Sequence, residues 1–465
     1  MSLSGRILDL IPSETIAAIA TAPGPSGISV IRISGSKAIS TADKIFAGKI
    51  KPSQASTQTV HYGKITDPTT KKIIDEVLLT VFLAPDSYTG ENMVEISGHG
   101  GDFVASAILK LVIKLGVRYA EPGEFTKRRV LAGKMDITQA EAVLDLVQAK
   151  NELVYRSAIE QLQGRLSGHI QTLTADIKTI LAQMENLLEF EEDQKQTEIE
   201  FKRLTNRLKK IRTNLEATVM KNEQLQFLRT GVYCVIIGRP NVGKSSLFNR
   251  LCETEKAIVT EIPGTTRDSL EQTIAINGMI FHLIDTAGMK TIIAPKGNKK
   301  IEALGIEKSK NWLEAADLVL AVYDNSSPVK KEDKLVYQVT SKKPHLSVLN
   351  KIDLQPHFNR RFLNNEKVYP VSAKFNQGIN RLKIAMTKIY QKKLPTNNNY
   401  LYLNTRHVDT IKRVAGLLTQ SEQEKYLDGS IINLRNGLDI LATVTSPVTN
   451  EQILDTIFTQ FCIGK

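Results

Sequence analysis

The sequence predicts a multidomain α/β protein: an N-terminal α/β domain, then a helical domain interrupted by an inserted α/β domain. The chain has 465 residues, enough for about three domains of about 150 residues each. Strand-like alternation runs to about residue 130 and helical periodicity to about 225; strands then alternate with helices to about 393, before a helical end. The expected segments are therefore 1–130, 131–225, 226–393 and 394–465, with the second and fourth forming one helical domain.

The composition is that of a globular protein with a basic charge balance. Lys and Arg number 61 against 49 Asp and Glu, a net charge of +12 that favours nucleic acid or an anionic membrane surface, although many basic proteins bind neither. No apolar run reaches the roughly 18 residues of a membrane span, and the N-terminus lacks a signal-peptide pattern. The 3 cysteines favour neither a disulfide framework nor a zinc site, so a cytoplasmic protein is expected.

Within the first segment, turn-rich stretches separate four strand patterns. These are IAAIA (16–20), ISVIRIS (28–34), EVLLTVFLAP (76–85) and NMVEISG (92–98), followed by the apolar-periodic helix ASAILKLVIKL (105–115).

The helical region contains two amphipathic stretches. Apolar residues from Ile159 to Leu187 recur every three or four positions and predict one long helix that packs on another, with tight packing or a bend expected at Gly164 and Gly168. The second stretch, FKRLTNRLKKIR (201–212), has basic but no acidic residues, and its expected buried stripe is Leu204, Leu208, Ile211 and Leu215. Its charges form either a phosphate-contacting face or a solvated helix surface, and sequence alone favours the second.

Residues 238–245, GRPNVGKS, fit the phosphate-loop pattern G-x-x-x-x-G-K-[ST]. A glycine turn with a surface lysine is the alternative, but the pattern follows the apolar strand VYCVII and opens the helix SSLFNRL, as phosphate binding requires. We expect Lys244 to reach the β- and γ-phosphates and the Ser245 hydroxyl to ligate Mg²⁺.

Three further motifs follow at predicted strand ends: DTAG (285–288), NKID (350–353) and SAK (372–374). Asp285 is expected to hold the metal through water, and the Gly288 N–H to sense the γ-phosphate. A carboxylate at Asp353 can accept hydrogen bonds from the ring N–H and the amine of guanine, a pair that adenine lacks. Together the motifs predict a Ras-like P-loop GTPase domain.

The catalytic position departs from the Ras pattern. Ras-like enzymes place a water-orienting glutamine after the D-x-x-G glycine, where this chain has Met289. A polar, lysine-rich stretch follows to Ile301 and is typical of a loop that orders around a γ-phosphate. Glu302 is the nearest carboxylate beyond it that could orient water; the alternative is an ordinary acid at a helix N-terminus.

At these residues the chain resembles the MnmE (also TrmE) family of tRNA-modifying GTPases. The resemblance covers the whole chain, through ETIAAIATAPGPSGISVIRISG, SYTGENMVEISGHGG, EPGEFTKRRVLAGKMDITQAEAVLDL, the GTPase motifs, IVTEIPGTTRD and the C-terminal FCIGK. It implies an N-terminal folate-binding domain that forms a homodimer, a helical domain made from both flanks, and the inserted GTPase domain. It also implies an FAD-containing MnmG (GidA) partner in a heterotetramer, and modification of C5 of the wobble uridine in certain tRNAs, with the carbon supplied by a folate.

The resemblance further assigns site residues, again as expectations. Arg32, Glu95, Lys134 and Lys465 match contacts to 5-formyl-tetrahydrofolate or a related folate. Asn241, Thr260, Ile262 and Thr265 match a K⁺ site, Thr266 a second Mg²⁺ ligand beside Ser245, and Glu302 the water-orienting glutamate. The stretch between Gly288 and Glu302 looks longer and more basic than is usual in the family. The expected GTP contacts are Asn241, Val242, Gly243, Lys244, Ser245, Ser246, Thr260, Glu261, Ile262, Pro263, Gly264, Thr265, Thr266, Asp285, Thr286, Ala287, Gly288, Asn350, Lys351, Asp353, Ser372, Ala373 and Lys374.

A few residues and two other functions stay open. Cys462 is either a reactive thiol near the one-carbon site or a buried structural cysteine, whereas Cys234 is expected in the core. His99 and His407 have no identifiable partner and receive no catalytic role. An RNA-binding GTPase of ribosome assembly is the main alternative function, although no G-x-x-G loop of KH type is visible. A membrane-remodelling GTPase is disfavoured because a lipid-binding amphipathic tail is lacking.

Overall fold

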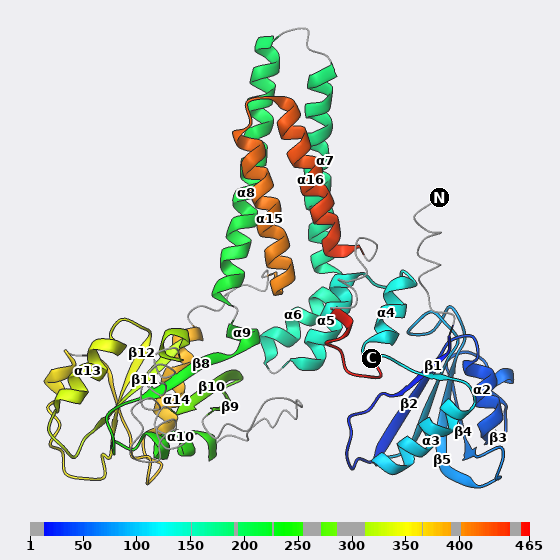
Figure 1. The fold of residues 1–465 in the computed structure, drawn as a ribbon, viewed down its shortest axis with the longest axis horizontal. Coiled ribbons are helices and arrows are strands. Elements are labelled where there is room, and N and C mark those ends of the chain that lie inside the picture. The colour runs from blue at the N-terminus through cyan, green and yellow to red at the C-terminus, as the bar shows by residue number, and fades with distance from the viewer. Residues whose placement is uncertain are drawn as a thin grey trace, which may run out of the picture. The chain divides into compact units, whose positions relative to one another are not determined.

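The computed structural model describes residues 14–149, 151–189, 194–225, 227–253, 271–285, 312–364, 366–391, 401–446 and 457–465. The chain divides into two compact units, shown in Figure 1. The first contains residues 1–148, 158–216 and 404–465, and the second contains residues 149–157 and 217–403.

A seven-stranded sheet in the described residues forms the N-terminal part of the first unit, in the order β3-β4-β5-β6-β2-β1-β7. Neighbouring strands pair antiparallel, except that β7 pairs parallel with β1. The elements are β1 (Ile16–Ile19), β2 (Ile28–Ser34), α2 (Ala38–Ile45), β3 (Phe46–Gly48), β4 (Thr59–Thr66), β5 (Ile73–Phe82), β6 (Met93–His99), α3 (Asp102–Lys114) and β7 (Arg118–Tyr119).

The two faces of this sheet differ because side chains alternate along each strand. One face packs against α2 and α3 in a core that includes Ile31, Leu79, Ile96 and Ile108. Other strand positions carry apolar side chains into solvent: Val60, Tyr62 and Leu78 are 58%, 65% and 49% exposed.

The helices of the first unit come from both ends of the chain. They are α4 (Glu124–Leu131), α5 (Ile137–Gln148), α6 (Glu152–Leu162, which crosses into the second unit), α7 (Arg165–Glu189), α8 (Gln194–Gln224, which crosses at its end), α15 (Thr405–Gln423) and α16 (Leu427–Thr445). Figure 1 shows α7, α8, α15 and α16 as long neighbouring helices. Ion pairs join α8 to α15 through Arg212 and Glu422, and α16 to α7 through Arg435 and Glu185.

The prediction of one continuous helix over Ile159–Leu187 is wrong, although the chain does depart from the helical path at Gly164, one of the two glycines where a bend was expected. The helix α6 ends at Leu162 and α7 begins at Arg165, because Gly164 adopts a φ of +86°, a left-handed conformation that ends the helix. Within α7 the predicted stripe is buried from Leu166 to Met184. In α8, Leu204, Leu208 and Leu215 are buried as predicted, while Ile211 is only partly buried.

A buried polar cluster connects the two flanks of the first unit. Glu141 in α5 accepts two hydrogen bonds from Arg406, of 2.8 and 2.7 Å, and lies 2.7 Å from His407 Nε2. Arg406 and His407 open α15, and Arg406 also donates to the carbonyls of Thr443 and Val444 near the end of α16. His407 is fully buried, and these contacts supply the partner that the sequence did not reveal and give it a structural role.

The second unit contains a six-stranded sheet in the described residues, in the order β13-β12-β11-β8-β10-β9. The sheet is parallel as predicted, except that β9 pairs antiparallel with β10. The elements are α9 (Phe227–Thr230), β8 (Val232–Ile237), α10 (Lys244–Glu253), β9 (Glu271–Ile276), β10 (Met279–Asp285), β11 (Leu318–Asp324), α13 (Lys331–Thr340), β12 (His345–Asn350), β13 (Val368–Pro370) and α14 (Ile379–Gln391).

Helices cover both faces of this sheet. Leu247 of α10 and Leu382 of α14 pack on one face with Ile236 and Val322, whereas Val336 of α13 packs with Tyr323 on the other. Cys234 lies in β8 and is fully buried, as predicted; burial raises the pKa of its thiol far above the ordinary value. None of the helices in the described ranges combines the length and apolarity that a membrane crossing needs.

Candidate nucleotide and N-terminal sites

The phosphate loop joins β8, which lies between β11 and β10 in the sheet, to the start of α10. Two glycines are required by geometry. A Cβ on Gly238 would lie 2.4 Å from the Val322 carbonyl oxygen, and Gly243 has a φ of +91° with its ideal Cβ 2.3 Å from Asn350 Nδ2. Asn241 also has a positive φ of 64°. The backbone thus curls tightly at the N-terminus of α10, where main-chain N–H groups and the helix dipole favour phosphate.

The polar side chains predicted for phosphate and metal lie at this loop. Lys244 is 8% exposed, and its Nζ donates to the Arg239 carbonyl oxygen at 3.0 Å, so the side chain folds back along the loop. Ser245 and Ser246 are exposed in the first turn of α10. Asp285 ends β10 and pairs in register with Ile236, one residue before the end of β8. Ser245, whose hydroxyl is expected to ligate a metal, and the acidic residue Asp285 therefore both follow or end neighbouring strands at the same edge of the sheet.

The NKID and SAK motifs are tied to each other and to the phosphate loop. Asn350, 2% exposed, donates through Nδ2 to the Val242 carbonyl at 2.9 Å and accepts at Oδ1 from the Ala373 N–H at 3.1 Å. The Ser372 hydroxyl donates to Asp353 Oδ1 at 2.6 Å. The Asp353 side chain is exposed, and this bond holds one of its carboxylate oxygens.

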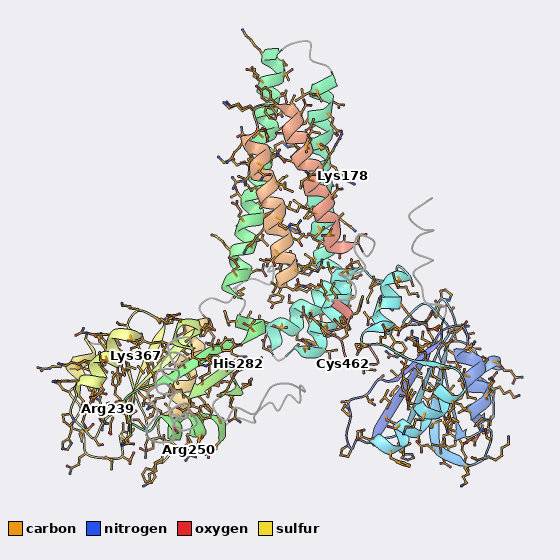
Figure 2. All side chains as sticks on the ribbon, in the orientation of Figure 1. Lys178, Arg239, Arg250, His282, Lys367 and Cys462 are labelled. Carbon is orange, nitrogen blue, oxygen red and sulfur yellow. The ribbon has the colours of Figure 1, made fainter. Side chains whose placement is uncertain are left out.

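Three residues of this edge, Asp324, Arg239 and Arg250, were not among the predicted site residues. Asp324 ends β11 and binds Lys351 Nζ at 2.8 Å, while Lys351 also donates to the Asn241 carbonyl at 2.7 Å. Burial would raise the pKa of Asp324, but bonds from Lys351 and Ser326 outweigh it and lower the pKa. Arg239, labelled in Figure 2, pairs with Asp324 at 3.6 Å and with Asp333 at 3.3 Å.

A signal for Asp324 was present, because it follows the apolar run LVLAVY at the carboxyl end of a parallel strand, where ligands of such sheets gather. Arg250 of α10, also labelled in Figure 2, had no such signal. Its guanidinium donates to the carbonyls of Ala373 at 3.0 Å and Lys374 at 3.2 Å, which fixes the SAK backbone.

Part of the predicted site lies outside the described residues. This applies to the water-orienting candidate, to Met289, to most of the K⁺ and second Mg²⁺ positions, and to the remaining GTP contacts. The residues concerned are Thr260, Glu261, Ile262, Pro263, Gly264, Thr265, Thr266, Thr286, Ala287, Gly288, Met289 and Glu302.

The residues predicted for folate gather in the first unit. Arg32 of β2 faces Glu95 of β6 in register and binds its Oε1 at 2.7 Å. The same guanidinium donates to the Gly464 carbonyl at 3.1 Å and lies 5.4 Å from the centre of the Tyr88 ring. The C-terminal turn is held closely, since Gly464 has a φ of +94° and a Cβ there would lie 2.4 Å from the Ile19 oxygen.

Lys134 follows α4 and contacts the loop between β5 and β6, which carries Tyr88. Its Nζ donates to the Pro85 carbonyl at 2.5 Å, and its side chain packs beside Gly90. Lys465 is partly buried and its N–H donates to the Cys462 carbonyl at 3.3 Å. Arg32 therefore contacts both Glu95 and the C-terminal turn directly. Lys134 contacts the loop between β5 and β6, and Tyr88 of that loop lies beside Arg32.

Comparisons with known proteins find matches along nearly the whole chain. The family model "GTP-binding protein TrmE N-terminus" matches residues 15–134, and "MnmE helical domain" matches residues 137–462. The "tRNA modification GTPase MnmE" of Bacillus licheniformis is 36% identical over 463 residues, covering 97% of this chain and all 100% of its own. The proteins of that name from Alkaliphilus oremlandii and Bacillus subtilis are 37% and 35% identical, each over 97% of this chain and over 99% and 100% of their own.

The chain belongs to the MnmE (TrmE) family of tRNA modification GTPases. Membership of the MnmE family makes it an enzyme, a GTP hydrolase. A solved structure titled "Crystal structure of a probable GTP-binding protein engB" covers 34% of this chain and 99% of its own at 20% identity, with a TM-score of 0.24, which is too low to bear on the fold.

Two side chains of this MnmE-family chain correct or complete the sequence interpretation. Cys462, labelled in Figure 2, is exposed, so the alternative of a buried structural cysteine is wrong. His99 has a partner after all: its Nδ1 lies 2.7 Å from Asp75 Oδ1, and this hydrogen bond raises the pKa of the imidazole. The Asp75 carboxylate also accepts the His99 N–H at 2.8 Å, which anchors the end of β6.

Proposed function

We propose that the chain is a K⁺-dependent GTPase that acts with an MnmG-like flavoprotein to modify the wobble uridine of certain tRNAs in the cytoplasm. The product is an aminomethyl or carboxymethylaminomethyl group on C5 of that uridine. The observation that carries the proposal is the sheet edge at which Asn350 joins the phosphate loop to the SAK backbone, in a chain similar to tRNA modification GTPases over 97% of its length.

The described edge suits GTP and Mg²⁺. Main-chain N–H groups of residues 241–246 would receive the phosphates, Lys244 would neutralise them, and the exposed Ser245 hydroxyl would ligate Mg²⁺ together with Thr266. Asp285, on the neighbouring strand, would hold water on the metal. Asp353 would accept from the guanine ring N–H and amine, with Lys351 and the SAK backbone closing over the base.

The K⁺ part of the proposal rests on Asn241 and on the family. Asn241 lies on the exposed turn of the phosphate loop with a φ of 64°, and Lys351 holds its carbonyl at 2.7 Å. Its side chain, with Thr260, Ile262 and Thr265, would hold K⁺, which supplies positive charge beside the phosphates as charge develops in hydrolysis. Glu302 would orient the attacking water in place of the glutamine that Met289 replaces.

The N-terminal cluster suits a folate. A pterin presents an adjacent ring N–H and amine, which one carboxylate can accept. Glu95 accepts from Arg32 through Oε1, and its side chain is 23% exposed, so the carboxylate can also accept the pterin pair. Arg32, Lys134 and Lys465 supply positive charge for the folate's glutamate tail. A bound folate would supply the one-carbon unit, and exposed Cys462 lies two residues from the carbonyl that Arg32 contacts.

A homodimer formed by the N-terminal domain is also proposed. Val60 and Tyr62 of β4 and Leu78 of β5 leave an apolar sheet face in solvent, and Tyr62 pairs with Leu78 in register. An exposed apolar face of this kind is typical of a protein interface. The flavoprotein would complete a heterotetramer with this dimer.

Deletion of the gene followed by mass spectrometry of tRNA nucleosides tests the function. We expect the C5-modified wobble uridines to disappear and to return when the wild-type chain is supplied. Unchanged wobble uridines together with a defect in ribosomal subunits would overturn the proposal and favour the assembly-factor function.

GTP turnover measured in K⁺ and in Na⁺ tests the cation and Glu302. We expect faster turnover in K⁺, and a loss of about 10²-fold or more in kcat for Glu302→Ala, the usual range for a lost acid–base group, with GTP affinity nearly unchanged. Glu332→Ala removes an exposed carboxylate from the first turn of α13 and serves as the control with unchanged turnover. Equal rates in the two salts would remove the cation from the mechanism, and a large loss of GTP binding in Glu302→Ala would make that residue structural.

A further inference from the structure

The outer side of α8 carries a stripe of cations. Lys202, Arg203, Arg207 and Lys210, with Ile199 before them and Asn206 among them, follow the three- and four-residue spacing of a helix, so they share one side of it. We call these six residues the α8 basic stripe. The side of α8 that carries Leu204, Leu208 and Leu215 is buried, so the stripe does not contribute to that core. Side chains project outward along α8 in Figure 2.

The stripe keeps most of its positive charge available. Among the described residues, its one ion pair is the long contact of Arg203 with Glu200, at 3.5 Å. Arg207 donates to the neutral amide of Gln183 at 2.8 Å, while Lys202 and Lys210 are exposed and have no ion pair with any residue in the described ranges.

Arg212, which follows the stripe on α8, shows the contrast. Its guanidinium binds Glu422 at 2.7 Å and Glu216 at 2.8 Å, and these bonds raise its pKa. Arg212 therefore has a structural task in the helical bundle. A helix surface that serves only solubility usually interleaves both signs of charge, which residues 201–212 do not.

The length of the stripe suits a nucleic acid strand. The side chains of all six residues lie together on one open stretch of the α8 surface. From Lys202 to Lys210 the helix rises about 12 Å at 1.5 Å per residue, which is long enough to follow several consecutive phosphates of a nucleic acid strand.

We propose that the α8 basic stripe binds the sugar–phosphate backbone of tRNA. The stripe has no aromatic side chain on which a base could stack, and its Lys and Arg side chains are phosphate donors. Paired RNA presents mainly phosphates and 2′-hydroxyls to a protein, so the stripe contacts a stem and leaves the wobble base to other residues. The inference rests on the proposed function, since that function makes tRNA the substrate.

Salt-dependent binding of a tRNA transcript with a wobble uridine tests the stripe. The full-length chain and the triple variant Lys202→Gln, Arg207→Gln and Lys210→Gln are titrated by fluorescence anisotropy at several NaCl concentrations. We expect affinity near 0.15 M salt to fall about 10- to 100-fold and the slope of log K against log salt to become shallower by about two. The control Lys37→Gln, Lys49→Gln and Lys51→Gln removes the same charge from exposed lysines of the first unit, and it should bind like the wild type.

The possible outcomes distinguish a failure of the stripe proposal from a failure of the proposed function. Equal loss in both triple variants would overturn the site, because net charge alone would then explain binding. Normal tRNA binding by the stripe variant would also overturn it, and a loss of flavoprotein association in that variant would assign the stripe to the partner protein. GTP turnover without tRNA should stay unchanged in both variants, which checks folding. Failure of the proposed function is read separately, from unchanged wobble uridines in the deletion strain.

Discussion

Asp353→Asn is expected to lower kcat/KM for GTP by about 10³-fold or more, because the amide can no longer accept two hydrogen bonds from guanine and leaves polar groups unpaired. The same change should improve use of xanthosine triphosphate, whose base carries an oxygen where guanine has its amine. Steady-state hydrolysis of both nucleotides measures the change. Asp353 is well placed for this test, since it is exposed and its carboxylate is oriented by the bond from the Ser372 hydroxyl at 2.6 Å.

The xanthosine nucleotide serves as the internal control of this experiment. A variant that has merely unfolded hydrolyses neither nucleotide, whereas a variant with changed base recognition gains one and loses the other. Ser372→Ala keeps the carboxylate and removes the bond that orients it, together with the bond that the Ser372 hydroxyl accepts from the Phe375 N–H at 3.3 Å. Each bond is worth about 1 kcal/mol, so the loss in kcat/KM should be no more than about 30-fold. Wild-type GTP kinetics in Asp353→Asn would show that the base is bound elsewhere.

Glu141→Gln is expected to lower the free energy of unfolding of the first unit by about 3 kcal/mol. The change leaves Arg406 without its carboxylate inside the helical bundle, and removal of one partner of a buried ion pair costs about 3–5 kcal/mol. Calorimetry of the full chain measures the effect as a lower transition temperature for one of its transitions. Glu185→Gln breaks the exposed pair with Arg435, whose side chain is 63% exposed, and should cost no more than about 1 kcal/mol.

The difference in unfolding free energy between the wild type and Glu141→Gln should depend on pH. Burial would raise the pKa of Glu141, but contacts with His407 and Arg406 hold it well below the ordinary value of 4.5. A carboxyl with a lowered folded-state pKa contributes its stability above the unfolded pKa and loses it as pH falls towards the folded pKa. The gap between wild type and Glu141→Gln should therefore be constant from pH 7 to about 5 and narrow below about 4.5. A gap that widened on acidification would contradict this assignment.

Local sequence patterns were sufficient to predict the nucleotide edge. A phosphate loop is one strand, one turn and one helix start, and its glycines are required by a local backbone path, as the φ of +91° at Gly243 shows. The NKID and SAK motifs each follow a strand of their own, and parallel strands bring their carboxyl ends to one edge. The family resemblance extended the prediction to the folate residues, of which Arg32 and Glu95 pair across neighbouring strands.

The prediction of the long helix failed for a reason that is also local. Apolar spacing continues through residues 159–187, and Gly164 indicated a bend, but the spacing does not record the φ of a single residue. At +86° Gly164 ends one helix and divides the pattern into α6 and α7. The exposure of Cys462 could not be predicted from the sequence either. No residue near it distinguished a buried thiol from an exposed one, because burial depends on how the C-terminal turn packs.

By itself the sequence indicated the family, the phosphate loop, the guanine motif and the helix- or strand-like spacing of apolar residues. Each of these depends on residues within a short stretch. Only the tertiary structure decided which distant residues meet. His407 and Glu141 are 266 positions apart and form one buried cluster, and Asp324 at the end of β11 binds Lys351, which directly follows β12. Such pairs depend on the path of the whole chain, which brings together charges that no local pattern relates.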